Sequence, residues 1–231
     1  MSTSQNPVLE LRDVSIACDD APVLRGLSLT ISPGVFHTIA DGSAAARSAL
    51  LRVLGLLDAP MSGEVLIEGR ATAGMHRIER DELRNRRCGF LFSAPFLLPT
   101  FSAVENVAMP IFKISQLTPE LTRERTNRFL EFAGLADDGG MPADTLTLFQ
   151  QHAVSLARAL ANEPAIITVE TPDAGLAPKE AVEFAKLLRA ACAQFGVAII
   201  AAMPADFAND PADRILAIAD CEMHLEGKPP A

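Results

Sequence analysis

Residues 35–57 have the pattern of a buried strand, a short loop and a helix. The strand segment, residues 35–40, reads VFHTIA and is mostly apolar. Leucines then recur at helical spacing over residues 50–57. A strand that passes through a loop into a helix is the setting of a phosphate-binding loop, so the segment predicts a nucleotide-binding fold.

The loop has lost most of the residue types that bind phosphate. Residues 41–48 read DGSAAARS, whereas the active pattern is G-x-x-x-x-G-K-[ST]. Asp41 and Ala46 replace the two glycines, Arg47 replaces the lysine, and only Ser48 keeps its type. An aspartate at the mouth of the loop repels phosphate. We interpret the following residues as the remnant of the loop: Asp41, Gly42, Ser43, Ala44, Ala45, Ala46, Arg47, Ser48 and Ala49.

Composition excludes several classes of function. The chain has 231 residues, of which 49% are hydrophobic, and a net charge of −9, which argues against binding to nucleic acid. No export signal and no run of about 18 apolar residues is visible, so we expect a cytoplasmic protein. The four cysteines and four histidines are scattered, which predicts neither disulfides nor a metal site.

Strands and helices alternate along the rest of the chain. This order predicts the α/β class, with a mostly parallel sheet covered on both faces. Further strands are expected at residues 9–11, 27–31, 65–67, 88–92, 165–169, 197–201 and 215–219, and helices at residues 118–134, 149–161 and 179–195. Residues 77–87 mix five arginines with acidic residues, which favours a solvated surface over a binding patch.

Three ordered stretches carry a family resemblance. They read LGLLDAPMSGEV at residues 54–65, LLPTFSAVENVAMP at residues 97–110 and SLARALANEP at residues 155–164. With these stretches the chain resembles an ABC-transporter nucleotide-binding subunit of the lipoprotein-releasing and macrolide-exporter type. The resemblance implies the ABC ATPase form of the P-loop NTPase fold, with an N-terminal antiparallel part. It also implies a single nucleotide-binding domain over residues 1–231, in which residues 1–92 and 156–231 form the core and residues 93–155 a helical subdomain.

The residues that the family uses for nucleotide chemistry are largely replaced. Ser93 stands where the family has the glutamine that senses the γ-phosphate. The family signature LSGGQ reads LTLFQ here, so Leu148 and Phe149 put side chains where backbone must approach a phosphate closely.

The acidic end of the next strand has changed as well. Where the family has Asp-Glu-Pro, the chain has Glu170 and Thr171 before the proline, and Met203 replaces the family histidine. Glu170 keeps the carboxylate that can hold Mg²⁺. Thr171 cannot act as a general base, because its hydroxyl has no proton affinity near neutral pH.

These replacements predict a pseudo-ATPase. Phosphoryl transfer needs several positioned contacts, and the loss of one such contact costs about 10²–10³ in rate. We therefore expect no hydrolysis, no catalytic residue and no bound cofactor. Under the alternative of a functional ATP-binding subunit with an unusual site, Arg47 would bind ATP, and Ser48 and Glu170 would hold Mg²⁺.

One stretch that is kept indicates a protein partner. The resemblance implies that residues around 97–110 receive a helix of a membrane permease, and their apolar content suits a helix-in-groove contact. The candidate partner-binding residues are Phe96, Leu97, Leu98, Phe101 and Met109. We expect a scaffold or regulator that binds a permease or another ABC subunit at the inner face of the cell membrane. Two alternatives stay open: these residues are core, or the chain is a soluble interaction protein with no membrane partner.

Overall fold

The computed structural model describes residues 6–18, 21–39, 42–171, 175–202, 214–219 and 222–226. Its strands are β1 (Leu9–Cys18), β2 (Ala21–Ile31), β3 (Phe36–Ile39), β4 (Ser62–Ile67), β5 (Arg70–Ala71), β6 (Cys88–Leu91), β7 (Ile166–Glu170), β8 (Ala198–Ala202), β9 (Arg214–Ala219) and β10 (Glu222–Glu226). Its α-helices are α1 (Ala44–Leu54), α2 (Arg77–Arg87), α3 (Ala103–Pro110), α4 (Pro119–Phe132), α5 (Leu148–Leu160) and α6 (Pro178–Phe195). A π-helical turn follows α3 at Ile111–Ser115, and a 3₁₀ turn at Ala143–Thr145 precedes α5.

The strands form two sheets. The order β2-β1-β4-β5 makes an antiparallel sheet from the N-terminal part of the chain. The order β10-β9-β3-β8-β7-β6 makes the central sheet, which is parallel except for the pair of β10 with β9. The predicted α/β class, with its mostly parallel sheet and N-terminal antiparallel part, is confirmed.

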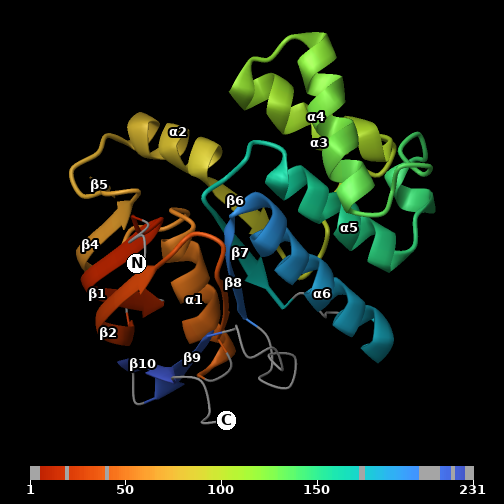
Figure 1. Ribbon diagram of the computed structural model, residues 1–231. Coiled ribbons are helices and arrows are strands. Elements are labelled where there is room, and N and C mark those ends of the chain that lie inside the picture. Colours follow the sequence, from red (N-terminus) through yellow and green to blue (C-terminus); the bar gives the residue numbers. More distant parts are fainter. Residues whose placement is uncertain are drawn as a thin grey trace, which may run out of the picture.

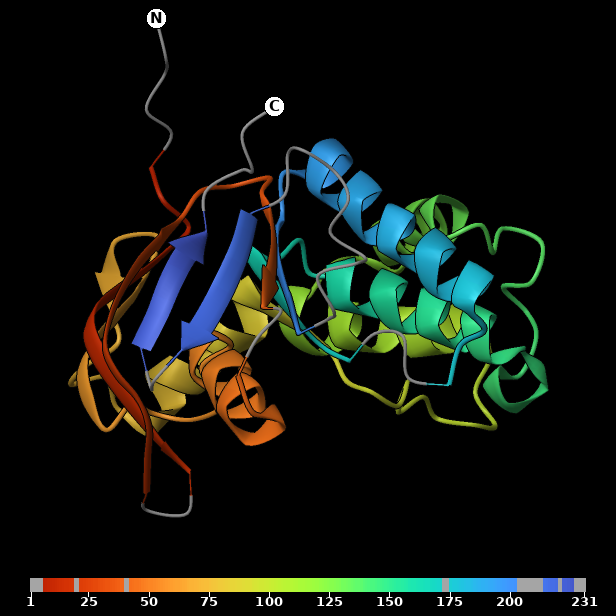
Figure 2. The same ribbon diagram turned by 90° about the horizontal axis from the view of Figure 1, so that it is seen from below.

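Helices cover both faces of the central sheet (Figures 1 and 2). Helix α1 lies between this sheet and the antiparallel one, whereas α5 and α6 lie on the opposite side. Successive residues of β7 therefore enter different cores: Ile166 packs toward α1 and Ile167 toward α5 and α6. Because both faces are buried, the strand reads as an unbroken apolar run instead of an alternating one.

Local signals fix the ends of the long helices. In α4 the hydroxyl of Thr118 accepts a hydrogen bond from the Leu121 N–H, and Pro119 occupies the first turn. Helix α6 ends at Gly196, whose φ of 68° is left-handed and suits glycine.

Four elements were not predicted. The charged segment at residues 77–87 is helix α2, in which Leu83 is the buried residue, and α3 is a short helix that ends at Pro110. The other two are the short strand β5 and the edge strand β10. The predicted subdomain boundary at residue 155 falls inside helix α5, which runs on to Leu160. The boundary stays a prediction.

Candidate nucleotide site

The expected phosphate loop is shorter than the sequence indicated. Strand β3 ends at Ile39 and α1 already begins at Ala44, so much of the remnant lies in the first turns of a helix. Ser43 caps the helix, because its Oγ accepts a hydrogen bond from the Ala46 N–H at 3.1 Å. Alanine favours helix by about 1 kcal/mol over the glycine of an active loop, which explains the earlier start.

The first turn of α1 still offers groups that attract phosphate. Its leading N–H groups have no carbonyl partner within the helix, and the helix dipole places partial positive charge there. Arg47 supplies a full charge, but its Nη1 donates a hydrogen bond to the Gly42 carbonyl at 2.6 Å. The side chain therefore lies folded back toward the loop. Asp41 lies outside the described residues.

Two side chains that could hold magnesium line one hollow. Ser48 of α1 and Glu170 at the end of β7 line the same shallow hollow. A hydroxyl and a carboxylate are ligands that Mg²⁺ accepts, so the residues present fit a magnesium-bound nucleotide. The remaining lining residues are Leu51, Arg52, Leu57, Phe90, Leu91, Phe92 and Thr168.

Arg52 is a charged residue of this hollow that the sequence did not single out. Its guanidinium donates two hydrogen bonds to Asp58, at 2.6 and 2.9 Å. The hydrogen bond from Arg52 lowers the pKa of Asp58, and the charge of Arg80 lowers it further. The hydrogen bond to Asp58 raises the pKa of Arg52, and the nearby charge of Glu170 adds to this effect. In the sequence, only the position of Arg52 one helical turn after Ser48 could have indicated that its side chain lines this hollow.

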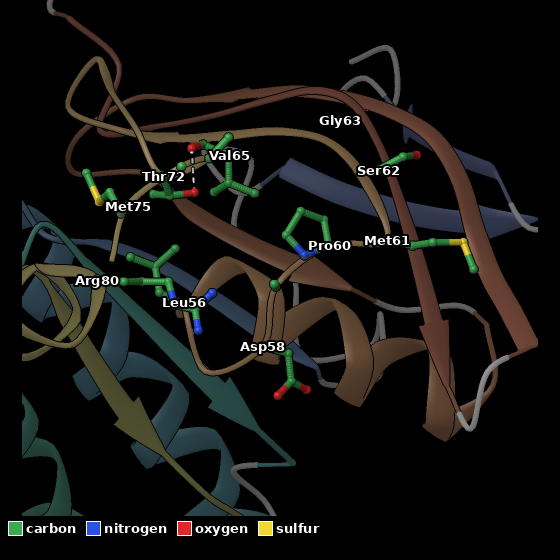
Figure 3. Close-up of a pocket in the computed structure, with 13 residues that line it drawn as sticks. Leu56, Asp58, Pro60, Met61, Ser62, Gly63, Val65, Thr72, Met75 and Arg80 are labelled. Atoms are coloured by element: carbon green, nitrogen blue, oxygen red, sulfur yellow. Dashed lines mark hydrogen bonds between the residues drawn. The ribbon is translucent and has the colours of Figure 1, made fainter. Parts of the chain in front are cut away.

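Asp58 lies at the edge of a second hollow, between α1, α2 and the antiparallel sheet, and its carboxylate points away from the other labelled side chains (Figure 3). Arg80 and Met75 line one end, and Met61 lines the other. The Arg52–Asp58 pair therefore lies between this hollow and the one that contains Ser48 and Glu170.

At the end of β7, Glu170 is the last described carboxylate, because Asp173 lies outside the described residues. Thr171 follows Glu170, is exposed, and donates its N–H to the Ala202 carbonyl at 3.2 Å. Its φ of 46° is left-handed, which is unusual for a β-branched residue and marks local strain. Met203, the residue at the family histidine position, lies outside the described residues.

Side chains occupy the signature position. The Thr147 hydroxyl accepts a hydrogen bond from the Gln150 N–H, and the Gln150 side-chain oxygen accepts one from the Thr147 N–H, so the start of α5 is well formed. Leu148 is 37% exposed, and a Cβ added to Gly175 would lie 3.1 Å from its Cδ2. Phe149 packs edge-on to Phe184, with ring centroids 6.3 Å apart.

The loop that follows β6 carries the remaining candidates. Ser93 is exposed. Phe96, Leu98, Phe101 and Met109 are exposed, and Phe112 joins them on the surface. Leu97 differs from the expectation, because it is partly buried and packs against the core of α5 and α6.

A parallel sheet whose strand β3 leads into the N-terminus of α1, with Ser48 and Glu170 in one hollow beside it, defines a nucleotide-binding α/β subunit. The chain belongs to the ABC transporter family, whose sequence pattern matches residues 24–173. The resemblance noted in the sequence is thereby confirmed.

Relatives and solved structures support the same assignment. The lipoprotein-releasing system ATP-binding protein LolD of Bordetella avium is 33% identical over 96% of this chain and 95% of its own length. The macrolide export ATP-binding/permease protein MacB of Syntrophobacter fumaroxidans is 33% identical over 92% of this chain but only 30% of its own length. The ATP-binding cassette MJ0796, solved in a post-hydrolysis state with ADP and Pi, aligns with a TM-score of 0.81 at 27% identity over 96% of this chain and all of that one.

The comparisons correct one expectation. We expected no bound cofactor, on the basis of the replaced loop residues. That expectation is wrong: the family and the relatives named above are ATP-binding proteins, and the aligned structure of MJ0796 holds ADP and Pi. Although the loop glycines are replaced, Ser48, Glu170 and the N-terminus of α1 remain as groups of the kinds that bind a magnesium-nucleotide.

The described residues contain neither a membrane-spanning helix nor a cluster of metal ligands. No helix among them is long and apolar enough to cross a membrane. The same part of the chain holds no cluster of His, Cys, Asp and Glu that could bind a metal ion by itself.

Proposed function

We propose that the chain is the ATP-binding subunit of an ABC transporter. We propose further that this subunit has lost ATP hydrolysis and acts as a scaffold or regulator on its membrane partner. The observation that carries this proposal is the end of β7, where Glu170 is followed by Thr171. A threonine hydroxyl cannot accept a proton from water near neutral pH, so this position supplies no general base.

Three side chains would bind the magnesium-nucleotide in different ways. Ser48 and Glu170 would hold the magnesium ion, which offsets the charge of the nucleotide phosphates when it is bound. Arg47 would contact the phosphates after releasing the Gly42 carbonyl. These groups can bind a nucleotide, but none of them activates water.

The signature position supports the same proposal. In ABC dimers each site combines the phosphate loop of one subunit with the signature of the other. Leu148 and Phe149 place apolar side chains where close approach of backbone to phosphate is needed. A second subunit would therefore also receive a defective signature from this chain.

A permease is the partner that the surface fits best. Phe96, Leu98 and Phe101 are exposed within six residues of one loop, and we call these three residues the apolar patch. Exposed apolar residues that gather on a surface mark interaction sites. The relative MacB is named as an ATP-binding and permease protein, and this chain spans 30% of its length. We therefore propose that the chain docks a permease and lies at the inner face of the cell membrane.

The test combines nucleotide titration with phosphate release. The chain has no Trp and no Tyr, so a fluorescent ATP analogue can be followed against a low protein background. We expect saturable binding that weakens by about tenfold in Arg47→Ala, the loss of one charge-assisted contact, without steady-state phosphate release. The control is Lys186→Ala, a surface charge on α6 that pairs with Glu183. Phosphate release that disappears in Glu170→Gln would show a working ATPase with an unusual site and contradict the proposal.

A further inference from the structure

The exposed apolar patch includes a strained residue. Phe96 is 68% exposed and has a φ of 44°, in the left-handed region that bulky residues avoid. Such a conformation persists only where surrounding contacts impose it, and strained residues gather at functional sites. An exposed phenylalanine gains little from burial, so another contact must hold the backbone at this position.

That contact comes from Arg158, in the last turn of α5. Its Nη1 donates to the Phe96 carbonyl and its Nη2 donates to the Pro95 carbonyl, both at 2.8 Å. Nη2 also reaches the hydroxyl of Ser155 at 3.3 Å. Among the described residues, Arg158 forms no ion pair, and burial lowers its pKa. Arg158 is half-buried, so its cation loses part of its hydration, and the two carbonyls and the Ser155 hydroxyl are the groups that compensate this loss.

Helix α5 is well placed to hold this loop. The last turn of α5 packs closely on β6, since a Cβ added to Gly89 would lie 3.0 Å from the Ala159 carbonyl. Strand β6 leads directly into the loop with Phe96. Phe96 in turn contacts Phe92 edge-on, with ring centroids 5.7 Å apart, and Phe92 lines the hollow of Ser48 and Glu170.

Asn106 holds the second half of the patch. This residue of α3 is fully buried, and its Oδ1 accepts the Leu98 N–H at 2.8 Å. Its Nδ2 donates to the carbonyls of Leu98, Phe101 and Ser102, at 3.0 to 3.2 Å. Buried side chains thus hold the backbone on both sides of Leu97, and the patch is ordered before any partner arrives.

We infer that Arg158 is a positioning residue, which holds the loop whose exposed apolar side chains dock the permease. Its guanidinium donates hydrogen bonds to the Pro95 and Phe96 carbonyls. These bonds fix the Phe96 backbone so that the ring projects to the surface. This inference rests on the proposed function, because it presumes that the patch docks an apolar helical segment of a permease. A lysine cannot replace the arginine, because one ammonium lacks the planar fork that reaches two carbonyls.

The test uses Arg158→Lys and two readouts. The first is hydrogen exchange of residues 95–102 by mass spectrometry, in which the Leu98 amide reports opening of the loop. The second is binding of the permease portion of the Syntrophobacter fumaroxidans MacB protein, purified in detergent. We expect exchange to rise and binding to weaken, each by about tenfold, the size of one lost charge-assisted hydrogen bond. The matched control is Arg128→Lys, whose guanidinium pairs with Glu163 on the surface of α4 and should change neither readout.

A double-mutant cycle separates positioning from a general structural role. Phe96→Ala should weaken permease binding as much as Arg158→Lys, and the double variant should bind no more weakly than either single one. Additive losses, or an Arg158→Lys variant that binds and exchanges like the wild type, would overturn the inference. If the wild-type chain does not bind the permease at all, the proposed function fails and this inference fails with it.

A further variant keeps the inference testable if Arg158→Lys does not fold. Glycine adopts a positive φ without strain, so Phe96→Gly should unfold at a higher urea concentration than Phe96→Ala. A lower midpoint for Phe96→Gly would show that the backbone at this position is not held under strain.

Discussion

At the scale of single residues, the Arg52–Asp58 pair beside the hollow of Ser48 and Glu170 gives a pH-dependent prediction. The pKa of Asp58 in the folded chain is lowered below its ordinary value of 3.8, so the pair stabilises the fold above that pH and the contribution is lost as the pH falls through the lowered pKa. Both side chains are about half exposed, so Asp58→Asn should cost less than about 1 kcal/mol at pH 7. Urea unfolding of both proteins at pH 7 and at about pH 3 checks this, because the difference should shrink at the lower pH. A difference that is constant with pH would mean that the carboxylate charge is not what stabilises the fold.

At the scale of elements, the early start of α1 gives the second prediction. Ser43→Ala removes the cap that accepts the Ala46 N–H and should destabilise the chain by about 1 kcal/mol, whereas Ser43→Gly should cost only a few tenths. Urea unfolding of the two variants measures both. Equal losses would show that the Ser43 hydroxyl does not cap the helix, and that the loop differs from the arrangement described.

The helices and strands also differ in how far the sequence predicts them. The buried strands β7 and β8 and the helix α6 were predictable, because apolar runs and end signals such as Gly196 are local. Helix α2 was missed because its charged residues hide a single buried position, Leu83. The hydrogen bonds of Arg158 were not predictable, because it binds carbonyls more than 60 residues away in sequence. Those of Asn106 were not predictable either, because they require the fold of the loop before α3. The motif replacements were visible in the sequence, and Ser48 and Glu170 were already candidate magnesium ligands there, but only the fold shows that both line one hollow.

At the scale of the whole molecule, two cores lie on opposite faces of the central sheet, and the one around α5 and α6 supports the signature position. Phe184 is 1% exposed and packs against both Phe149 and His152. Phe184→Ala should cost about 3–5 kcal/mol, a large part of the 5–15 kcal/mol that a typical domain has. Phe112→Ala, at a position 55% exposed, should cost less than about 0.5 kcal/mol. Urea unfolding compares the two, and similar losses would place Phe184 outside the core.

A single-turnover assay measures whether the chain binds nucleotide without hydrolysing it. The protein is mixed in excess over ATP labelled at the γ-phosphate, with magnesium present, so that even slow or product-inhibited cleavage would be seen. We predict that the label stays on bound ATP over hours, and that Glu170→Gln behaves the same way apart from weaker binding. Release of labelled phosphate by the wild type but not by Glu170→Gln would contradict the account.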